Sequence, residues 1–178
     1  MATQMGVIAL VPLGPVPGDL LDWLRSRLMK VLDAQVVAGK ELPLPQEAYK
    51  PGRQQYEGDA LLAQLRRISF PGARRLVGLV DADCYADGLN FIFGQAAVGG
   101  REAFIALPRL RQSFYGLPED QALFRERALK EVVHELGHTW CLAHCPDPEC
   151  VMHFSNRLED TDIKGLEFCP RCQAKMTG

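Results

Sequence analysis

The sequence lacks a long hydrophobic run, an excess of charge of either sign, and any internal repeat or low-complexity tract. Its longest apolar stretch, residues 5–13, is far shorter than the roughly 20 residues of a membrane-spanning helix, and no Lys or Arg precedes it as in a signal peptide. The 20 Lys and Arg residues against 22 Asp and Glu residues give a net charge of -2, which provides no broad cationic field for nucleic acid or an anionic membrane. We therefore expect a soluble cytoplasmic protein that binds neither nucleic acid nor membrane.

Histidine and cysteine are few and unevenly distributed. All four histidines lie between His134 and His153, and five of the six cysteines lie between Cys141 and Cys172. A chain without an export signal that gathers Cys and His together is more typical of metal binding than of a disulfide framework. The sequence therefore predicts a metal-binding protein, and its 178 residues suit one compact domain, which we expect to be a monomer.

The residues before this cluster alternate short apolar runs with amphipathic stretches. The pattern predicts strands at residues 5–13, 35–38, 76–80, 91–97 and 103–107, and helices at 19–33, 59–68 and 119–140. Pro118 is expected to open the last helix, and Gly99 and Gly100 to turn an antiparallel hairpin between the last two strands. This order predicts an α+β fold with a mixed, mostly parallel twisted sheet packed by helices.

His134, Glu135 and His138 form an H-E-x-x-H pattern at the C-terminal end of the long predicted helix. Histidines four residues apart lie on one face of a helix, where both imidazoles can reach a single zinc ion at about 2.0 to 2.1 Å. Glu135 beside them can act as general base towards a zinc-activated water and then return the proton to a leaving amine. The alternative is a solvated helix face, since a five-residue pattern also arises by chance.

A catalytic zinc needs a third protein ligand and one open position. His144 lies six residues after His138, out of phase with the helix, so the chain must turn sharply after Trp140 to bring it to the metal. His153 is a competing candidate for this third position.

Four cysteines form a second candidate site. They are arranged as a C-x4-C and a C-x2-C pair separated by 18 residues, namely Cys145, Cys150, Cys169 and Cys172. Such pairs suit a closed, structural zinc site, which would staple together a small C-terminal subdomain (145–178) that follows an N-terminal subdomain (1–144) and has few apolar residues of its own. Disulfides in an exported protein, simple burial, and a nucleic-acid-binding zinc ribbon remain alternatives, although the nearby basic residues alternate with acidic ones.

The segments H-E-L-G-H-T-W-C-L-A-H-C-P-D-P-E-C-V-M (residues 134–152) and F-C-P-R-C (residues 168–172) resemble the archaemetzincins, zinc peptidases of the metzincin clan. The resemblance implies a zincin-like fold in which the three histidines of residues 134–144 bind catalytic zinc and Glu135 is the general base. It also implies that Met152 lies beneath this metal, that the four cysteines bind a second zinc ion, and that residues 91–95 form an edge strand that pairs with substrate.

One position departs from the metzincin pattern, because Cys141 stands where the pattern has glycine. Glycine suits a turn with positive φ, and another residue there costs of order 1 kcal/mol or more. The Cys141 thiol could bind metal, form a disulfide with Cys145, or be buried without either role. We favour burial.

These observations predict a zinc-dependent metallopeptidase that hydrolyses peptide or protein substrates with two zinc ions per chain. The alternative is a binding or scaffold protein that keeps the peptidase fold without stable catalytic zinc.

Overall fold

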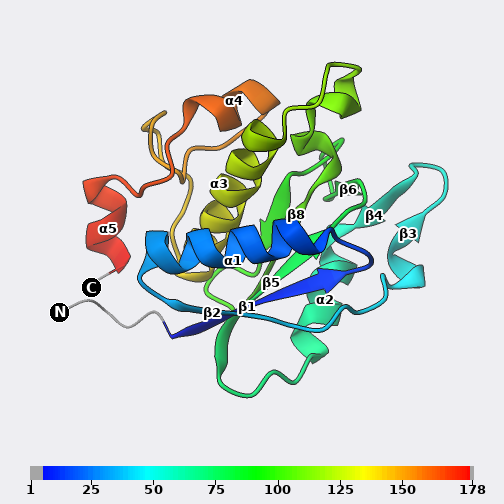
Figure 1. The fold of residues 1–178 in the computed structure, drawn as a ribbon, viewed down its shortest axis with the longest axis horizontal. Coiled ribbons are helices and arrows are strands. Elements are labelled where there is room, and N and C mark those ends of the chain that lie inside the picture. The colour runs from blue at the N-terminus through cyan, green and yellow to red at the C-terminus, as the bar shows by residue number, and fades with distance from the viewer. Residues whose placement is uncertain (1–5, 177–178) are drawn as a thin grey trace.

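A five-stranded sheet forms the centre of the protein, whose computed structural model describes residues 6–176 (Figure 1). Its strands, in spatial order, are β2 (Gln35–Ala38), β1 (Val7–Leu13), β5 (Ala73–Val80), β8 (Glu102–Ala106) and β7 (Gly94–Ala96). The first four are parallel to one another, whereas β7 is antiparallel to β8. The predicted mixed, mostly parallel sheet and the closing hairpin are confirmed; residue 5 of the first predicted strand lies outside the described residues.

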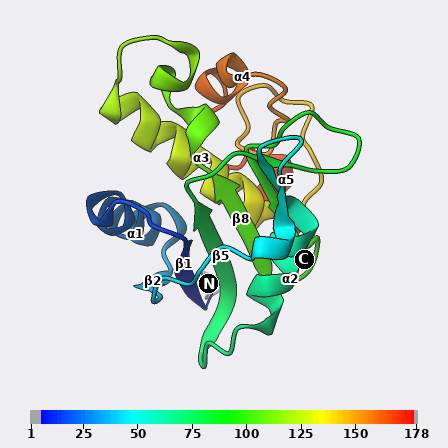
Figure 2. The ribbon, with the colours of Figure 1, turned by 90° about the vertical axis from the view of Figure 1, so that its right-hand side faces the viewer.

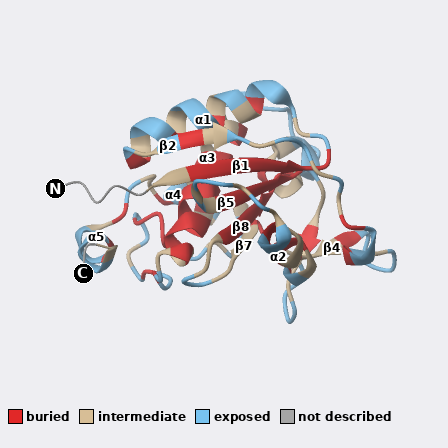
Figure 3. Ribbon diagram, turned by 90° about the horizontal axis from the view of Figure 1, so that it is seen from below, coloured by how far each residue is buried: buried red, intermediate tan, exposed pale blue. Residues whose placement is uncertain are grey.

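Strand β1 is apolar throughout because helices cover both faces of the sheet. Ile8 and Leu10 belong to the hydrophobic cluster under α1 (Gly18–Leu32) and α3 (Gln121–Thr139), whereas Ala9 and Val11 belong to the cluster under α2 (Gly58–Arg67). Successive side chains of a strand point to opposite faces, so a strand buried on both sides needs this continuous apolar run. Figures 2 and 3 show the buried strands between α1 on one side and α2 on the other.

Helix α1 follows the predicted spacing closely. Its buried residues recur every four positions, at Leu20, Leu24, Leu28 and Leu32. Each fully buried leucine side chain contributes roughly 1.5 to 3 kcal/mol to the free energy of folding. This packing stabilises the helix although no side chain caps its N-terminus. The helix ends at Leu32, and the left-handed conformation of the C-cap residue Asp33 turns the chain into β2.

Helix α3 begins later than its sequence predicts. Pro118 lies before the helix, and Asp120 is the N-cap, because its Oδ1 accepts a hydrogen bond of 2.9 Å from the Leu123 N–H. The aspartate side chain gives one of the first backbone N–H groups of the helix a partner, which fixes the start of the helix after Asp120. The predicted metal ligands His134 and His138 lie near the C-terminal end of this helix.

Several short elements have no counterpart in the prediction. They are the three-stranded sheet of β3 (Tyr49–Lys50), β4 (Gln55–Glu57) and β6 (Cys84–Tyr85), the 3-10 turns Gln46–Ala48, Pro108–Leu110 and Gln112–Tyr115, and helices α4 (Leu158–Ile163) and α5 (Pro170–Met176). The short helices α4 and α5 follow α3 in the chain, and α4 lies beside α3 (Figure 1). None of the described helices combines the length and the apolar character needed to cross a membrane.

Candidate metal centre and active-site cleft

The last two turns of α3 bring the H-E-x-x-H residues to the floor of a cleft. His134 and Glu135 are buried there, and His138 is half-buried. The Nε2 atoms of His134 and His138 lie 3.2 Å apart. Two nitrogens bound to one tetrahedral zinc at about 2.0 to 2.1 Å lie roughly 3.3 Å apart, so the spacing of the rings suits a shared ion.

His144 joins this pair from the chain that follows the helix. One ligand atom from each of the three histidines lies within 4.8 Å of the others. His153 belongs to neither of the two candidate metal groups among residues 6–176, and its Nδ1 lies 2.9 Å from the Cys145 carbonyl oxygen. The geometry therefore groups His144, rather than His153, with the two helical histidines.

The turn that delivers His144 has the backbone conformation that the sequence predicts. The Leu142 N–H donates to the Gly137 carbonyl oxygen at 3.0 Å, and Cys141 has φ 64°, in the left-handed region. The preference for burial of Cys141 is wrong, because its side chain is exposed. Cys141 is also outside any disulfide and belongs to neither candidate metal group.

Backbone carbonyls orient two of the imidazoles. His134 Nδ1 donates to the Val151 oxygen and His138 Nδ1 donates to the Leu142 oxygen, each at 2.7 Å. A neutral ring that donates through Nδ1 has its lone pair on Nε2, so the two Nε2 lone pairs face each other. Two such lone pairs at 3.2 Å repel each other unless a cation lies between them. This pair of facing nitrogen atoms is the feature of the structure that fits a bound metal ion.

The surroundings also favour neutral imidazoles. Burial lowers the pKa of His134 well below its usual range, and the nearby Lys164 ammonium lowers it further. Burial likewise lowers the pKa of His138 and His144. Neutral histidine is the form that ligates zinc, so no proton has to leave before a metal binds at neutral pH.

Glu135 lies beside the histidines and makes close contact with strand β7. A Cβ atom at Gly94 would come within 2.8 Å of Glu135 Cγ and Oε1, so the carboxylate packs directly against the strand. Burial raises the pKa of Glu135 well above its usual range, and the neighbouring Glu131 raises it further. A carboxylate with a raised pKa is a stronger base once it is ionised.

The cleft above these residues has a volume of about 480 Å³. Helix α3 lines one side, residues 89–96 line the opposite side, and residues 154–156 with His144 complete the rim. The strand predicted at 91–97 is shorter in the structure, because only Gly94–Ala96 pairs with β8. This short edge strand lines the cleft along its length.

Met152 lies directly under the metal-site helix. It is fully buried, and a Cβ atom at Gly137 would come within 2.2 Å of its sulfur. Glycine at this position of the H-E-x-x-H turn is therefore what lets the methionine pack against the helix backbone.

The four predicted cysteines converge as a second group. The Cys145 and Cys169 sulfurs are 3.7 Å apart, and those of Cys150 and Cys172 are 3.8 Å apart. These distances are too long for a disulfide, but thiolates about 2.3 Å from a tetrahedral zinc lie roughly 3.8 Å apart. A hydrogen bond from the Cys172 backbone lowers the pKa of Cys169 to about 7, whereas burial raises the pKa of Cys150 and Cys172.

Two polar residues beside the histidines escaped prediction from the sequence. Glu131 lines the cleft one helical turn before Glu135, and Lys164 is buried against it. The helical spacing of Glu131 from His134 was a usable signal, since residues three apart share a face. Lys164 has no such signal, because a lysine is rarely buried and its contact with α3 spans 30 residues of sequence.

Comparison with known proteins gives a consistent result. Residues 21–178 match the model of Peptidase family M54. Among curated relatives, the archaemetzincin of Pyrococcus abyssi is 45% identical over 97% of this chain and 95% of its own length, and that of Thermococcus kodakarensis is 42% identical over 97% and 96%.

Solved structures show the same similarity. The crystal structure of archaemetzincin from Methanopyrus kandleri has a TM-score of 0.85 and 40% identity over 96% of this chain and 93% of that one. The archaemetzincin from Archaeoglobus fulgidus, complexed with malonate, has a TM-score of 0.83 and 35% identity over 95% and 99%.

Proposed function

The chain belongs to peptidase family M54, the archaemetzincins, and is therefore a zinc metallopeptidase; on that premise we propose which of its residues perform the chemistry. The proposed ligands of the catalytic zinc are His134, His138 and His144. The observation that carries this assignment is the 3.2 Å separation of two Nε2 lone pairs at the floor of an open cleft, with the third imidazole within reach. When bound, zinc supplies Lewis acidity, which makes water a nucleophile near neutral pH and polarises the peptide carbonyl.

Glu135 is the proposed general base. Its carboxylate lies on the cleft floor beside the histidines and accepts a proton from the attacking water. Burial raises its pKa, which favours uptake of the water proton, and the same carboxyl group would then pass that proton to the departing amine. Contact with Gly94 holds the carboxylate between the helix and the edge strand, where an extended peptide would bind.

Substrate is proposed to bind along β7. This strand pairs with β8 through one edge, and its residues also line the cleft. A peptide in extended conformation can add to such an edge through main-chain hydrogen bonds, which places a peptide bond above Glu135 without demanding a particular sequence.

A second zinc ion is proposed at the four cysteines. The sulfur separations support thiolate ligation. With all four positions taken by sulfur, this ion would be structural. It would cross-link the two ends of the proposed C-terminal subdomain (145–178), which contains all four cysteines and follows residues 1–144.

The proposed compartment is the cytoplasm. No disulfide joins any of the six cysteines, and cysteines stay reduced in that compartment. Action as a monomer on peptides, without nucleic acid or membrane, stays a prediction. The scaffold alternative has no support, because the three histidines and Glu135 are all present and converge in the cleft.

Removal of the histidine-site metal tests this function. A chelator too weak to strip the cysteine site is expected to lower cleavage of a peptide library by at least about 100-fold, and addition of one equivalent of Zn²⁺ is expected to restore it. Mass spectrometry of the cleaved peptides provides the measurement. Cleavage that survives the chelator unchanged contradicts the proposed function.

A further inference from the structure

Lys164 is buried completely beside the metal-site helix. Its side chain is 0% exposed, and its Nζ lies 2.8 Å from Oε1 of Glu131, whose side chain is 4% exposed. An ammonium group removed from water costs several kcal/mol unless it is paired, and replacement of a buried ion pair by apolar side chains is often neutral or stabilising. Stability alone is therefore a weak reason for this pair.

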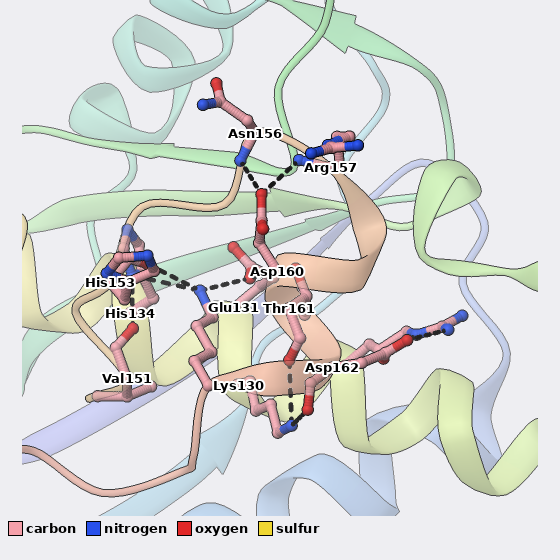
Figure 4. A network of polar contacts seen from close by, with 12 residues as sticks. Lys130, Glu131, His134, Val151, His153, Asn156, Arg157, Asp160, Thr161 and Asp162 are labelled. Carbon is pink, nitrogen blue, oxygen red and sulfur yellow. Dashed lines mark hydrogen bonds and ion pairs between the residues drawn. The ribbon is translucent and has the colours of Figure 1, made fainter. Parts of the chain in front are cut away.

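The position of the ammonium relative to the histidines is more informative. Lys164 Nζ lies 3.5 Å from His134 Nδ1 and 3.5 Å from the His153 carbonyl oxygen. His134 Nδ1 already donates to the Val151 oxygen, as Figure 4 shows, so it cannot accept a hydrogen bond from lysine. The lysine thus places a full positive charge against one edge of an imidazole whose other edge faces the metal position.

Glu131 is the group that opposes this charge. Its Oε1 accepts from Lys164 and, at 3.3 Å, from the Thr161 hydroxyl, so two groups of the C-terminal segment hold it. Two carboxylates of α4 are used elsewhere: Asp160 accepts from the backbone N–H groups of residues 156 and 157, and Asp162 pairs with Arg127 (Figure 4). Among the described contacts, the ammonium therefore depends on Glu131 for its negative partner.

We propose that Glu131 is a positioning residue of the histidine site: it acts through Lys164, cancels the ammonium charge beside His134, and so maintains the affinity of the three histidines for zinc. The inference rests on the proposed function, because it requires His134 to be a ligand. Without Glu131, the unbalanced ammonium repels a divalent cation at the far nitrogen of the same ring. Without both charged groups, that repulsion is absent.

Titration with Co²⁺ tests the proposal, because the visible absorption of the ion reports occupancy without catalysis. The cysteine site is first filled with Zn²⁺, and the histidine site is then titrated with Co²⁺ against a competing chelator. Glu131→Gln is expected to weaken Co²⁺ binding about tenfold or more, the range found when partners of metal ligands are removed. The double variant Glu131→Gln/Lys164→Met is expected to bind within about threefold of wild type.

A neighbouring ion pair provides the matched control. Arg127 and Asp162 also join α3 to α4, with Nε–Oδ1 and a second nitrogen–oxygen distance both of 2.6 Å, but Arg127 lies almost two helical turns before His134. Asp162→Asn is therefore expected to loosen α4 and to leave Co²⁺ affinity unchanged.

Each other outcome is decisive. Wild-type affinity in Glu131→Gln overturns the proposal, as does a double variant that binds as weakly as Glu131→Gln, since damage other than charge would then be the cause. A loss in Asp162→Asn equal to that in Glu131→Gln also overturns it. A wild-type protein whose histidines bind no Co²⁺ contradicts this inference and the proposed ligands together, whereas wild-type binding without an effect of Glu131→Gln contradicts this inference alone.

Discussion

Replacement of Glu135 by glutamine is expected to lower kcat for peptide hydrolysis by about two to four orders of magnitude, the usual contribution of a general base. Glutamine keeps the size of the side chain and its contact with Gly94, but its amide cannot take a proton from water. The buried position leaves little room for another base to replace it, since Glu135 is 5% exposed. Rates measured on one peptide substrate, with zinc content determined on the same samples, provide the comparison.

Glu126→Gln is the matched control for this variant. Glu126 lies on the same helix, is half-exposed, and pairs with Arg27 at the surface, away from the cleft. The control is expected to keep full activity, and both variants are expected to keep the zinc content of the wild type. If Glu135→Gln hydrolyses peptides within a factor of about two of wild type, another group must accept the proton.

The Cys169→Ser/Cys172→Ser variant is expected to lose the cysteine-site zinc and several kcal/mol of folding stability. One kcal/mol corresponds to about 2 to 4 °C in a domain of this size, so Tm should fall by roughly 10 °C or more. The reason lies in the contacts of this segment: the Val151 N–H donates to the Glu167 oxygen at 3.0 Å, and the Cys145 N–H donates to the Met152 oxygen at 2.9 Å. Calorimetry and metal analysis of the purified variant measure both effects.

The same variant should also weaken the histidine site. The Val151 carbonyl that orients His134 follows Cys150 directly, so loss of the cysteine site frees an imidazole to rotate. Cys141→Ser is the control, because this exposed thiol belongs to neither candidate metal group and its replacement should change neither zinc content nor Tm. A double cysteine variant that keeps its zinc and its Tm would show that the four thiols hold no structural ion.

The parts of the structure that depend on periodicity and local spacing were predictable from the sequence. The strand of residues 7–13 and the leucine spacing of α1 carry enough apolar residues to define their elements. The positions of His134, Glu135 and His138 follow from one helical turn. His144 and the four cysteines could be anticipated because metal ligands leave few residue types to choose from.

The remainder depends on contacts between distant residues. Residues 91–93 look like the start of a strand, but the Ile92 N–H donates to the Cys84 oxygen and leaves only Gly94–Ala96 paired with β8. Helix α4 has little apolar surface and is held by polar contacts, among them Arg127 with Asp162. The burial of Lys164 follows only from the meeting of α3 with the segment after α4, which no local pattern reveals.

The central claim is that three imidazoles share one ion at the open cleft while four sulfurs enclose another. Anomalous scattering from crystals of the zinc-loaded protein, recorded on both sides of the zinc absorption edge, tests it most directly. We expect one peak within about 2.1 Å of a nitrogen of each of His134, His138 and His144, and a second within about 2.3 Å of all four cysteine sulfurs. Absence of the first peak, with the three rings turned away from one another, would contradict the account.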